Sequence, residues 1–379
     1  MALAEDTKPI SPRRPTWRSR LLKLAASPRF QSWAARFPLT RGLVRREGEA
    51  LFGIVQGFVA SQVLFALVEL RIPHRILERP GTAKELASEV GLAVDRMQRL
   101  LQAGAGLGLL RRRGDRFALS TRGAALIGVP GLEDMIRHHD LLYRDLADPV
   151  AFLRGDTQPE LARFWPYVFG AGAAEDPDTA RRYSDLMAQS QGLVAQEVLQ
   201  TVSLQGTTRL MDIGGGTGAF AAAALKATPG LIVTLMDLPQ VIDAARTRLA
   251  GSPVLERLHF FPGSFRDDPL PSGADAATLV RVLYDHADDT VTALLQKVKR
   301  ALPPGGRLIV AEPMSGGETP DPIGDVYFAF YCMAMRTGTV RSQAEIAALL
   351  AEAGFVDIQT PRPLRAFVAS VVTARVPSA

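Results

Sequence analysis

The most distinctive chemistry in the sequence is a glycine-rich run, Asp212-Ile213-Gly214-Gly215-Gly216-Thr217-Gly218, between an apolar segment and an expected helix. Glycines at such a junction let backbone N–H groups approach a ligand at the start of the helix. Asp237 ends the next apolar segment, 19 positions after Gly218. A carboxylate there can accept hydrogen bonds from both hydroxyls of a ribose. These residues, with the adjacent Leu238, predict a nucleoside-binding site.

The glycine spacing alone leaves more than one ligand open. Gly214, Gly216 and Ala219 also fit a dinucleotide-binding turn, and tight packing of a strand on a helix needs no ligand. Asp212 directly precedes the glycines, where its carboxylate would face an amino group. That position favours S-adenosylmethionine over NAD.

Candidate acid–base residues lie at the end of the fourth expected strand, in the run Arg281-Val282-Leu283-Tyr284-Asp285-His286. Tyr284 and His286 are two positions apart, so in an extended chain they would share a face. Near pH 7 a neutral imidazole accepts a proton better than a phenol of pKa about 10. His286 is therefore the predicted base, with Tyr284 orienting a hydroxyl; alternatively, His286 is a polar residue at a helix entry.

Three further polar residues are candidates for the same site. His139 lies on an expected helix beside His138 and is an alternative base, or part of an ordinary polar helix face. Glu312 ends the fifth expected strand and can hydrogen-bond near the base. Arg281 can bind the carboxylate of the cofactor, or be an ordinary strand charge.

The histidine and cysteine content does not favour metal binding. Five histidines occur without an H-x-x-x-H pattern, and Cys332 is the single cysteine, so no metal site is predicted. Cys332 is expected to be a small buried residue. One cysteine and no recognisable signal peptide are typical of a cytoplasmic protein.

The elements that must position these residues alternate between strand and helix from Thr207 onward. The apolar runs predict a parallel sheet covered on both faces, closed by an antiparallel edge. The expected strands are 209–214, 232–237, 258–263, 276–286, 306–313, 355–360 and 366–374. The expected helices are 219–227, one opening at Pro239, 288–302, 321–336 and 342–354.

The chain before this region predicts a mostly helical half. A helix over 51–72, a helix capped by Thr82, another capped by Asp95 and a hairpin around Gly114 together form a winged-helix pattern. The second helix of that pair is largely apolar, which argues against a nucleic-acid partner. The apolar run 51–72 contains four polar residues, which favour a buried helix over a membrane span. The predicted domains are an arm (1–48), a helical domain (49–200) and a nucleoside-binding domain (201–379).

The first 50 residues are strongly basic. They hold eleven Lys or Arg and four acids, a charge of +7, whereas the whole chain carries +5. Interleaved apolar residues make 16–37 a basic amphipathic segment that suits an anionic membrane surface. The alternative is a solvated arm or one that wraps around a second subunit.

The order of motifs resembles the O-methyltransferase family of plant phenolic and hydroxyindole methyltransferases over about residues 50–375. The resemblance rests on LMDIGGGTG, LMDLP, GSF, RVLYDHADD, LPPGGRLIVAEP and EIAALLAEAGF. It implies a class I methyltransferase fold with a Rossmann-like sheet, a winged-helix-like dimerisation domain and a homodimer. It also implies S-adenosyl-L-methionine as cofactor, with Gly214 and Gly216 at its methionine, Asp237 at its ribose, and Ser264 and Phe265 near its adenine.

Two departures separate the chain from the usual family pattern. Ser264 stands where the family usually has Asp, so adenine recognition is expected to rest more on Phe265. Tyr284 stands where the family usually has its catalytic His, so the base cannot be carried over.

Three segments resemble a narrower group, the carotenoid O-methyltransferases of purple bacteria. They are the arm, IRHHDLLYRDLADPVAFLRG, and RVLYDHADD with FYCMAMRTGTVRS. The resemblance implies an apolar substrate, an acyclic carotenoid with a tertiary hydroxyl, met at the inner or chromatophore membrane. Bacteriochlorophyllide and phenolic methyltransferases, and more remotely a DNA-binding regulator, are the alternatives.

Overall fold

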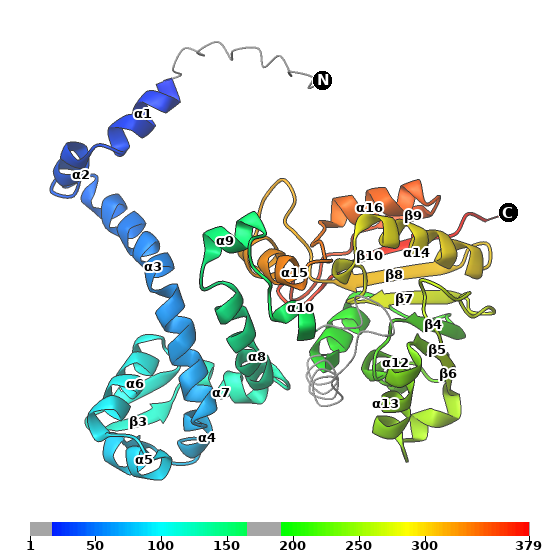
Figure 1. Ribbon diagram of the computed structural model, residues 1–379, viewed down its shortest axis with the longest axis horizontal. Helices are drawn as coiled ribbons and strands as arrows, with labels where there is room; N and C mark the ends of the chain where they lie inside the picture. The colour runs from blue at the N-terminus through cyan, green and yellow to red at the C-terminus, as the bar shows by residue number, and fades with distance from the viewer. Residues whose placement is uncertain (1–16, 165–190, 379) are drawn as a thin grey trace.

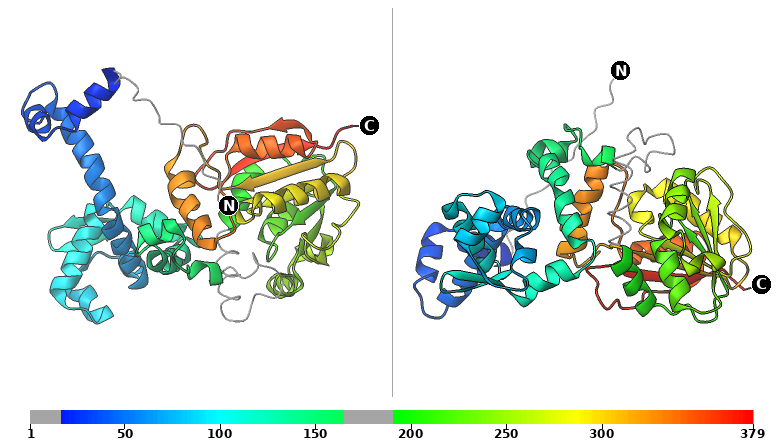
Figure 2. Two further views of the ribbon diagram at one scale, coloured as in Figure 1. Left: turned by 45° about the horizontal axis from the view of Figure 1, so that its top comes forward. Right: turned by 90° about the horizontal axis from the view of Figure 1, so that it is seen from below.

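The computed structural model describes residues 17–164 and 191–378, which form a helical N-terminal half and an α/β C-terminal half (Figure 1). Residues 1–16 of the expected arm and 165–190 of the expected helical domain lie outside the described residues. The views in Figure 2 show α1 and α2 at the outer end of the long helix α3, away from the sheet. The described arm is thus carried on a projecting helix.

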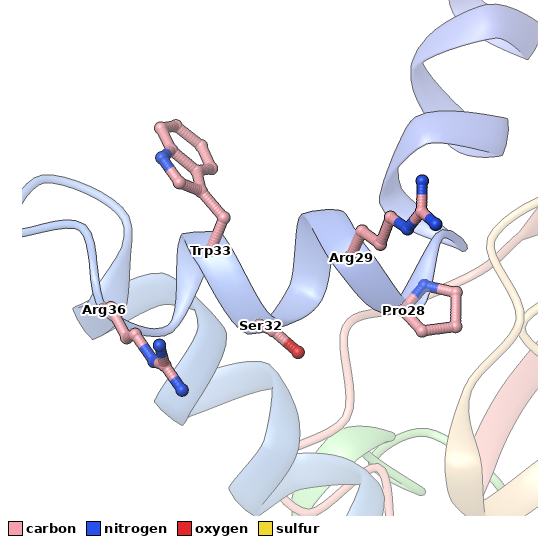
Figure 3. A pocket seen from close by; sticks show the side chains of 5 residues that line it. All are labelled: Pro28, Arg29, Ser32, Trp33 and Arg36. Carbon is pink, nitrogen blue, oxygen red and sulfur yellow. The ribbon is translucent and has the colours of Figure 1, made fainter.

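The arm consists of α1 (Trp17–Ala25), α2 (Pro28–Ala34) and the first turns of α3 (Arg41–Glu69). Residues 17–46 hold eight Lys or Arg and no acid. The ring of Trp33 stacks on Phe37 with centroids 4.9 Å apart, yet Trp33 remains 52% exposed. Pro28, Arg29, Ser32, Trp33 and Arg36 line an open hollow of about 500 Å³ on α2 (Figure 3). The arm therefore presents aromatic and cationic groups together to its surroundings.

Helix α3 is long and apolar, but little of it is covered within one chain. By length and composition it could cross a membrane, and 11% of its most apolar stretch is buried. Its exposed apolar side chains are Leu51, Phe52, Ile54, Val55, Phe58 and Val59. The prediction of a buried helix over 51–72 is thus wrong for the single chain, because only its final turns pack on α6 and α8.

The winged-helix pattern is present and packs as a small core of its own. Helix α5 (Ala83–Val90) begins with a capping box between Thr82 and Glu85, as such sequence signals predict. Helix α6 (Val94–Gly106) begins after Ala93, so Asp95 lies in its first turn and does not cap it. Strands β2 (Leu110–Arg113) and β3 (Arg116–Leu119) form the hairpin, and β1 (Gly81–Thr82) pairs with β3. Helix α6 buries Met97 and Leu101 in this core.

The C-terminal half is a seven-stranded sheet in the order β6-β5-β4-β7-β8-β10-β9. The first five of these are parallel, and the last two are antiparallel, as expected from the sequence. The strands are β4 (Arg209–Ile213), β5 (Ile232–Asp237), β6 (Leu258–Pro262), β7 (Ala276–Val280), β8 (Arg307–Glu312), β9 (Val356–Gln359) and β10 (Ser370–Arg375). Chain order reverses next to β4, so the carboxyl ends of β4 and β7 flank the crevice where such sheets bind ligands.

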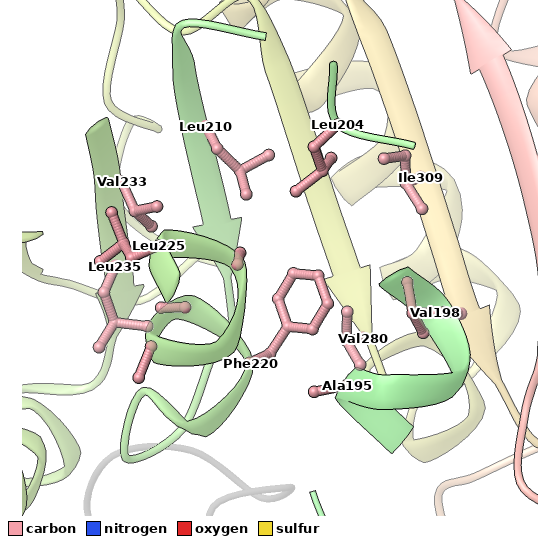
Figure 4. Close-up of a cluster of buried hydrophobic side chains, with 14 of the residues drawn as sticks. Ala195, Val198, Leu204, Leu210, Phe220, Leu225, Val233, Leu235, Val280 and Ile309 are labelled. Atoms are coloured by element: carbon pink, nitrogen blue, oxygen red, sulfur yellow. The ribbon is translucent and has the colours of Figure 1, made fainter. Parts of the chain in front are cut away.

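Helices cover both faces of this sheet, with an apolar core on each side. They are α12 (Ala219–Ala227), α13 (Pro239–Leu249), α14 (Asp288–Ala301) and α16 (Gln343–Glu352). Figure 4 shows one core, in which Phe220 of α12 lies among Leu210, Val280 and Ile309 of three strands. Buried apolar strands on both faces explain why these runs lack polar alternation.

The two halves meet where α8 (Leu132–Asp145) lies against η4 (Pro322–Phe328) and α15 (Ala329–Met335). The segment η4 is a π-helix, a rare element that is frequent at functional sites. Further short helices include α4 (Ile72–Arg75), α7 (Thr121–Gly128), α9 (Pro149–Arg154) and α10 (Leu161–Phe164). Helix α8 of the helical half thus packs directly on elements of the C-terminal half.

The exposed face of α3 yields a prediction about assembly. Covering Phe or Ile with apolar surface contributes about 1.5–3 kcal/mol per side chain. Ile54→Asp with Phe58→Asp should therefore convert a dimer into a 40.9 kDa monomer in light scattering after size exclusion. The control is Gln56→Glu, which adds charge to the same helix at a polar position. An unchanged dimer in the double variant would exclude this face from the interface.

Candidate active site

The glycine turn between β4 and α12 has a backbone that only glycine adopts without cost. Gly214, Gly216 and Gly218 have φ of 64°, 59° and 77°, in the left-handed region that other residues disfavour. A Cβ on Gly215 would overlap Leu235 and the carboxylate of Asp212. The turn therefore lies flat against the sheet, where the N–H groups of Gly214 and Gly215 both donate to the carbonyl of Met236 on β5.

Asp237 is fixed at the edge of this turn by two backbone donors. The N–H of Gly216 donates to Oδ2 at 2.7 Å, and that of Leu238 donates to Oδ1 at 2.8 Å. Burial raises the pKa of Asp237 to about 6, although these two hydrogen bonds oppose the shift. Above that pH the carboxylate is charged and has lone pairs left to accept further hydrogen bonds.

Asp212 lies beneath the glycine turn and is fully buried. Its Oδ1 accepts a 2.7 Å hydrogen bond from the hydroxyl of Thr278. Within the described part of the chain, its Oδ2 has no hydrogen-bond partner. Burial raises the pKa of Asp212 to about 7. An orphaned acceptor under a glycine turn, with Asp237 at its edge, fits a cationic nucleoside such as S-adenosylmethionine.

The GSF segment reaches the same turn through its phenylalanine. A Cβ on Gly214 would be 3.0 Å from Val282 and 3.9 Å from the ring of Phe265. The hydroxyl of Ser264 instead donates to Asp267 at 2.9 Å within its own loop. Phe265 thus borders the predicted adenine position, whereas the side chain of Ser264 shapes the loop.

The structure separates Tyr284 from His286. Strand β7 ends at Val280, and Leu283–Asp285 form a 3-10 turn, η3. The prediction that the two side chains share a strand face is therefore wrong. The Nδ1 of His286 lies 2.9 Å from the guanidinium of Arg266, and its ring is 5.3 Å from that of Phe265. Burial and then the charge of Arg266 lower the pKa of His286 to about 4, so His286 faces the GSF segment.

Tyr284 instead faces η4 of the C-terminal half. Its side chain is 1% exposed, and its hydroxyl accepts a 3.4 Å hydrogen bond from Arg281. The ring of Phe328 meets it edge-on at 6.4 Å. Burial raises the pKa of Tyr284 far above its usual value. Arg281 itself has φ of 60°, a strained backbone for a residue with a side chain.

Glu312 positions the turn that carries Tyr284. Its Oε2 accepts the backbone N–H of Tyr284 at 3.1 Å, and the side chain is fully buried. Burial raises the pKa of Glu312 to about 7. Burial also raises the pKa of Asp285 to about 8; Arg281 opposes the shift and Glu312 adds to it. Glu312 is thus a buried acceptor for the backbone of the turn.

Arg341 is a site residue that the sequence analysis missed. It is 3% exposed and donates to the carbonyls of Leu283 and His286 at 3.1 and 3.0 Å. It also forms an ion pair with Asp288. It was quoted from the sequence only within FYCMAMRTGTVRS and given no role, because it lies more than 50 positions from the turn that it holds. Thr278 was missed as well, although one hydroxyl in an otherwise apolar strand is a visible signal.

His139 lies on α8, opposite the π-helix. Its Nε2 is 2.6 Å from the hydroxyl of Tyr327, and Nε2 of His138 is 2.8 Å from the hydroxyl of Tyr331. Burial lowers the pKa of both histidines, that of His138 to about 4. The run 327–336 is therefore partly core and partly a hydrogen-bonded contact. Cys332 is buried as expected. No group of three or more potential metal ligands occurs in residues 17–164 and 191–378.

The geometry of Asp237 leads to a prediction about ligand binding. Asp237→Asn should weaken binding of S-adenosylhomocysteine about 10- to 100-fold, since a hydrogen bond to a charged group contributes about 1.5–3 kcal/mol. Asp243→Asn, which changes an exposed carboxyl on the following helix α13, is the matched control.

The raised pKa of Asp237 adds a pH dependence to this test. Protonation removes acceptor capacity, so affinity should fall by about tenfold per pH unit below pH 6 in the parent. The Asp237→Asn variant should lack this decline. Calorimetry measures both effects, and equal affinity in parent and variant would contradict the ribose role.

Comparison with solved structures supports the assigned fold and cofactor. Mitomycin 7-O-methyltransferase superposes with a TM-score of 0.72 at 27% identity, covering 89% of this chain and 99% of that one. A methyltransferase of calicheamicin biosynthesis, bound to S-adenosylhomocysteine, gives 0.71 at 26%, covering 88% and 98%. Human N-acetylserotonin methyltransferase in complex with S-adenosylmethionine shares the fold, with a TM-score of 0.75 at 24% identity, covering 88% and 98%. The cofactor of this chain is S-adenosylmethionine.

Sequence relatives match almost the whole chain. Demethylspheroidene O-methyltransferase of Cereibacter sphaeroides is 59% identical over 358 residues, 94% of each chain. The protein of the same name from Rhodobacter capsulatus is 54% identical over 97% of this chain and 91% of its own. Family models for an O-methyltransferase dimerisation domain and an O-methyltransferase domain match residues 52–127 and 143–356. The chain belongs to the S-adenosylmethionine-dependent O-methyltransferase family and, through its dimerisation domain, assembles as a homodimer.

Proposed function

We propose that this enzyme methylates the tertiary C-1 hydroxyl of an acyclic carotenoid of the demethylspheroidene or hydroxyneurosporene type, in spheroidene biosynthesis. The observation that carries the proposal is the 59% and 54% identity, over nearly full length, to two proteins named for that substrate. The environment of Tyr284 is consistent with an apolar substrate. It is bordered by Phe328, whose ring in turn contacts Tyr327.

In this proposal some residues of the chain bind the cofactor, and others orient the acceptor hydroxyl. When bound, S-adenosylmethionine supplies an electrophilic methyl group. The glycine turn and Asp237 hold the nucleoside, and Phe265 borders the adenine. Arg281 and Tyr284 fix the place of the incoming hydroxyl, while Glu312 and Arg341 keep the turn in position. Placing the reacting oxygen about 3–3.5 Å from the methyl carbon supplies much of the rate acceleration.

Product formation from competing substrates tests this proposal. The purified protein with labelled S-adenosylmethionine should transfer label to a 1-hydroxy carotenoid in detergent. It should transfer at least about 100-fold less to a catechol or a bacteriochlorophyllide, because a misplaced nucleophile loses the proximity term. Label in either alternative, with none in the carotenoid, would replace the proposed substrate but leave the family unchanged.

We further propose that the arm docks on anionic membranes, where so apolar a substrate resides. Trp17, Leu21 and Leu22 of α1 are more than half exposed. The adjacent Arg18, Arg20 and Lys23 complement anionic lipid, and residues 17–46 contain no acid. Exposed aromatic and aliphatic side chains interleaved with cations are typical of interfacial helices. The protein is then cytoplasmic and peripheral at the inner or chromatophore membrane.

Vesicle flotation with matched charge changes tests the membrane contact. Each basic residue near an anionic surface contributes about 1 kcal/mol. Neutralising Arg18, Arg20 and Lys23 to Gln should therefore weaken binding to phosphatidylserine-containing vesicles about 100-fold. The control neutralises Arg111, Arg112 and Arg113, the exposed basic run on β2.

Two further results would decide the role of the arm. Removing residues 1–45 should abolish binding, and vesicles of phosphatidylcholine alone should bind weakly at all salt concentrations. Equal binding by the parent, the α1 variant and the truncated chain would remove the arm from the membrane contact.

A further inference from the structure

The hydrogen-bonded pair His139–Tyr327 contains an imidazole, the basic group that position 284 lacks because it is a tyrosine. We propose that these residues form a proton relay, with Tyr327 contacting the hydroxyl of the acceptor substrate and His139 receiving its proton. This inference rests on the proposed function, because it names how the acceptor hydroxyl of that reaction loses its proton.

The first support is the short contact within the pair. Nε2 of His139 and the hydroxyl of Tyr327 are 2.6 Å apart, and the two rings are perpendicular with centroids 5.4 Å apart. The sulfur of Met135, a weak acceptor, lies 3.9 Å from the same hydroxyl. The imidazole is therefore the dominant partner of the phenol. Whether Nε2 of His139 or the hydroxyl of Tyr327 donates in this hydrogen bond depends on the tautomer of His139.

The second support is the location of Tyr327 near η3, the turn that carries Tyr284. Its ring contacts Phe328 at 4.9 Å, and Phe328 in turn contacts Tyr284 at 6.4 Å. The charge of Arg281 lowers the pKa of Tyr327, against a larger increase caused by burial, and acts on Tyr284 as well. The charge of one guanidinium thus acts on both phenols, and the guanidinium donates a hydrogen bond to Tyr284. The π-helix supports this placement because consecutive residues, Tyr327 and Phe328, both contact site residues.

The third support concerns His286, the base predicted from the sequence. Nδ1 of His286 is occupied by Arg266, on the GSF side of the turn. His139 instead stays neutral because burial lowers its pKa, so it can accept a proton at neutral pH and release it afterwards.

The relay balances without any additional reactant. The substrate oxygen forms a bond to the methyl carbon as the bond from that carbon to sulfur breaks, and the electron pair of the broken bond stays on sulfur. The hydroxyl proton passes to the oxygen of Tyr327, and the proton of Tyr327 passes to Nε2 of His139. The positive charge of the sulfonium thereby moves to the imidazole. Since an oxygen that gains a methyl group becomes strongly acidic, a phenol–imidazole chain is a sufficient acceptor.

The neighbouring pair His138–Tyr331 provides a matched control. It joins the same two elements with a 2.8 Å contact. Tyr331 is buried in the apolar cluster of Leu142, Phe152 and Leu161, whereas Tyr327 packs against that cluster only in part. Substitutions in this pair therefore disturb the same contact between the halves but leave the imidazole of His139 and the hydroxyl of Tyr327 in place.

The test compares the two pairs in the full-length dimer with a 1-hydroxy carotenoid. Tyr327→Phe and His139→Ala should each lower kcat about 100-fold, the range of a positioned proton acceptor, with KM changed by less than about threefold. His138→Ala and Tyr331→Phe should retain kcat within about threefold. Added imidazole should restore His139→Ala at least about tenfold but leave Tyr327→Phe unchanged. All variants should bind S-adenosylhomocysteine like the parent.

The outcomes separate this inference from the proposed function. A parent enzyme that does not methylate the carotenoid refutes the function. An active parent whose His139→Ala variant matches His138→Ala, with no rescue by imidazole, overturns the relay. Retained cofactor affinity shows that a loss of kcat does not come from misfolding.

Discussion

The constraint on which the site depends is the close approach of the glycine turn to the sheet at β4. Gly215 leaves no room for a side chain against Leu235 and Asp212. Because the turn lies this close, the N–H of Gly216 reaches Asp237 at the end of the next strand. The cofactor site is thus set by backbone geometry, which any Cβ at position 215 would break.

The second half of the site is assembled from distant segments. Arg341 and Glu312 hold the turn after β7 from opposite sides, one by donating to its carbonyls and the other by accepting an N–H. Tyr327 and His139 reach the same region from elements nearly 190 positions apart. The residues proposed to hold the methyl donor and those proposed to contact the acceptor substrate therefore lie on different elements of the protein. The helical half contributes His139 of α8 to this region.

The sequence was sufficient to predict the sheet, because the signals for its strands and helices come from neighbouring residues. Strand β5 and helix α12 match their predicted residues because apolar runs and glycine junctions are properties of neighbouring residues. The same holds for the capping box at Thr82. The roles assigned to Asp212, Gly214, Gly216, Asp237 and Leu238 remain predictions, now supported by a geometry that fits a nucleoside.

The sequence was insufficient where a side chain depends on a distant partner. The assumption of an extended chain put Tyr284 and His286 together, but a 3-10 turn held by Arg341 points them apart. The sequence predicted correctly that α3 is apolar. It did not predict whether the apolar face of α3 packs against its own chain or against a second copy. Tyr327 looked like ordinary core because its partner, His139, is visible only in the folded chain.

The backbone of Arg281 has a consequence for how this enzyme can evolve. A left-handed conformation costs a residue with a side chain about 1–2 kcal/mol that glycine does not pay. Glycine at position 281 would therefore relieve this strain but remove the guanidinium that donates to Tyr284. Heat resistance and the positioning of Tyr284 thus place opposite demands on this one codon.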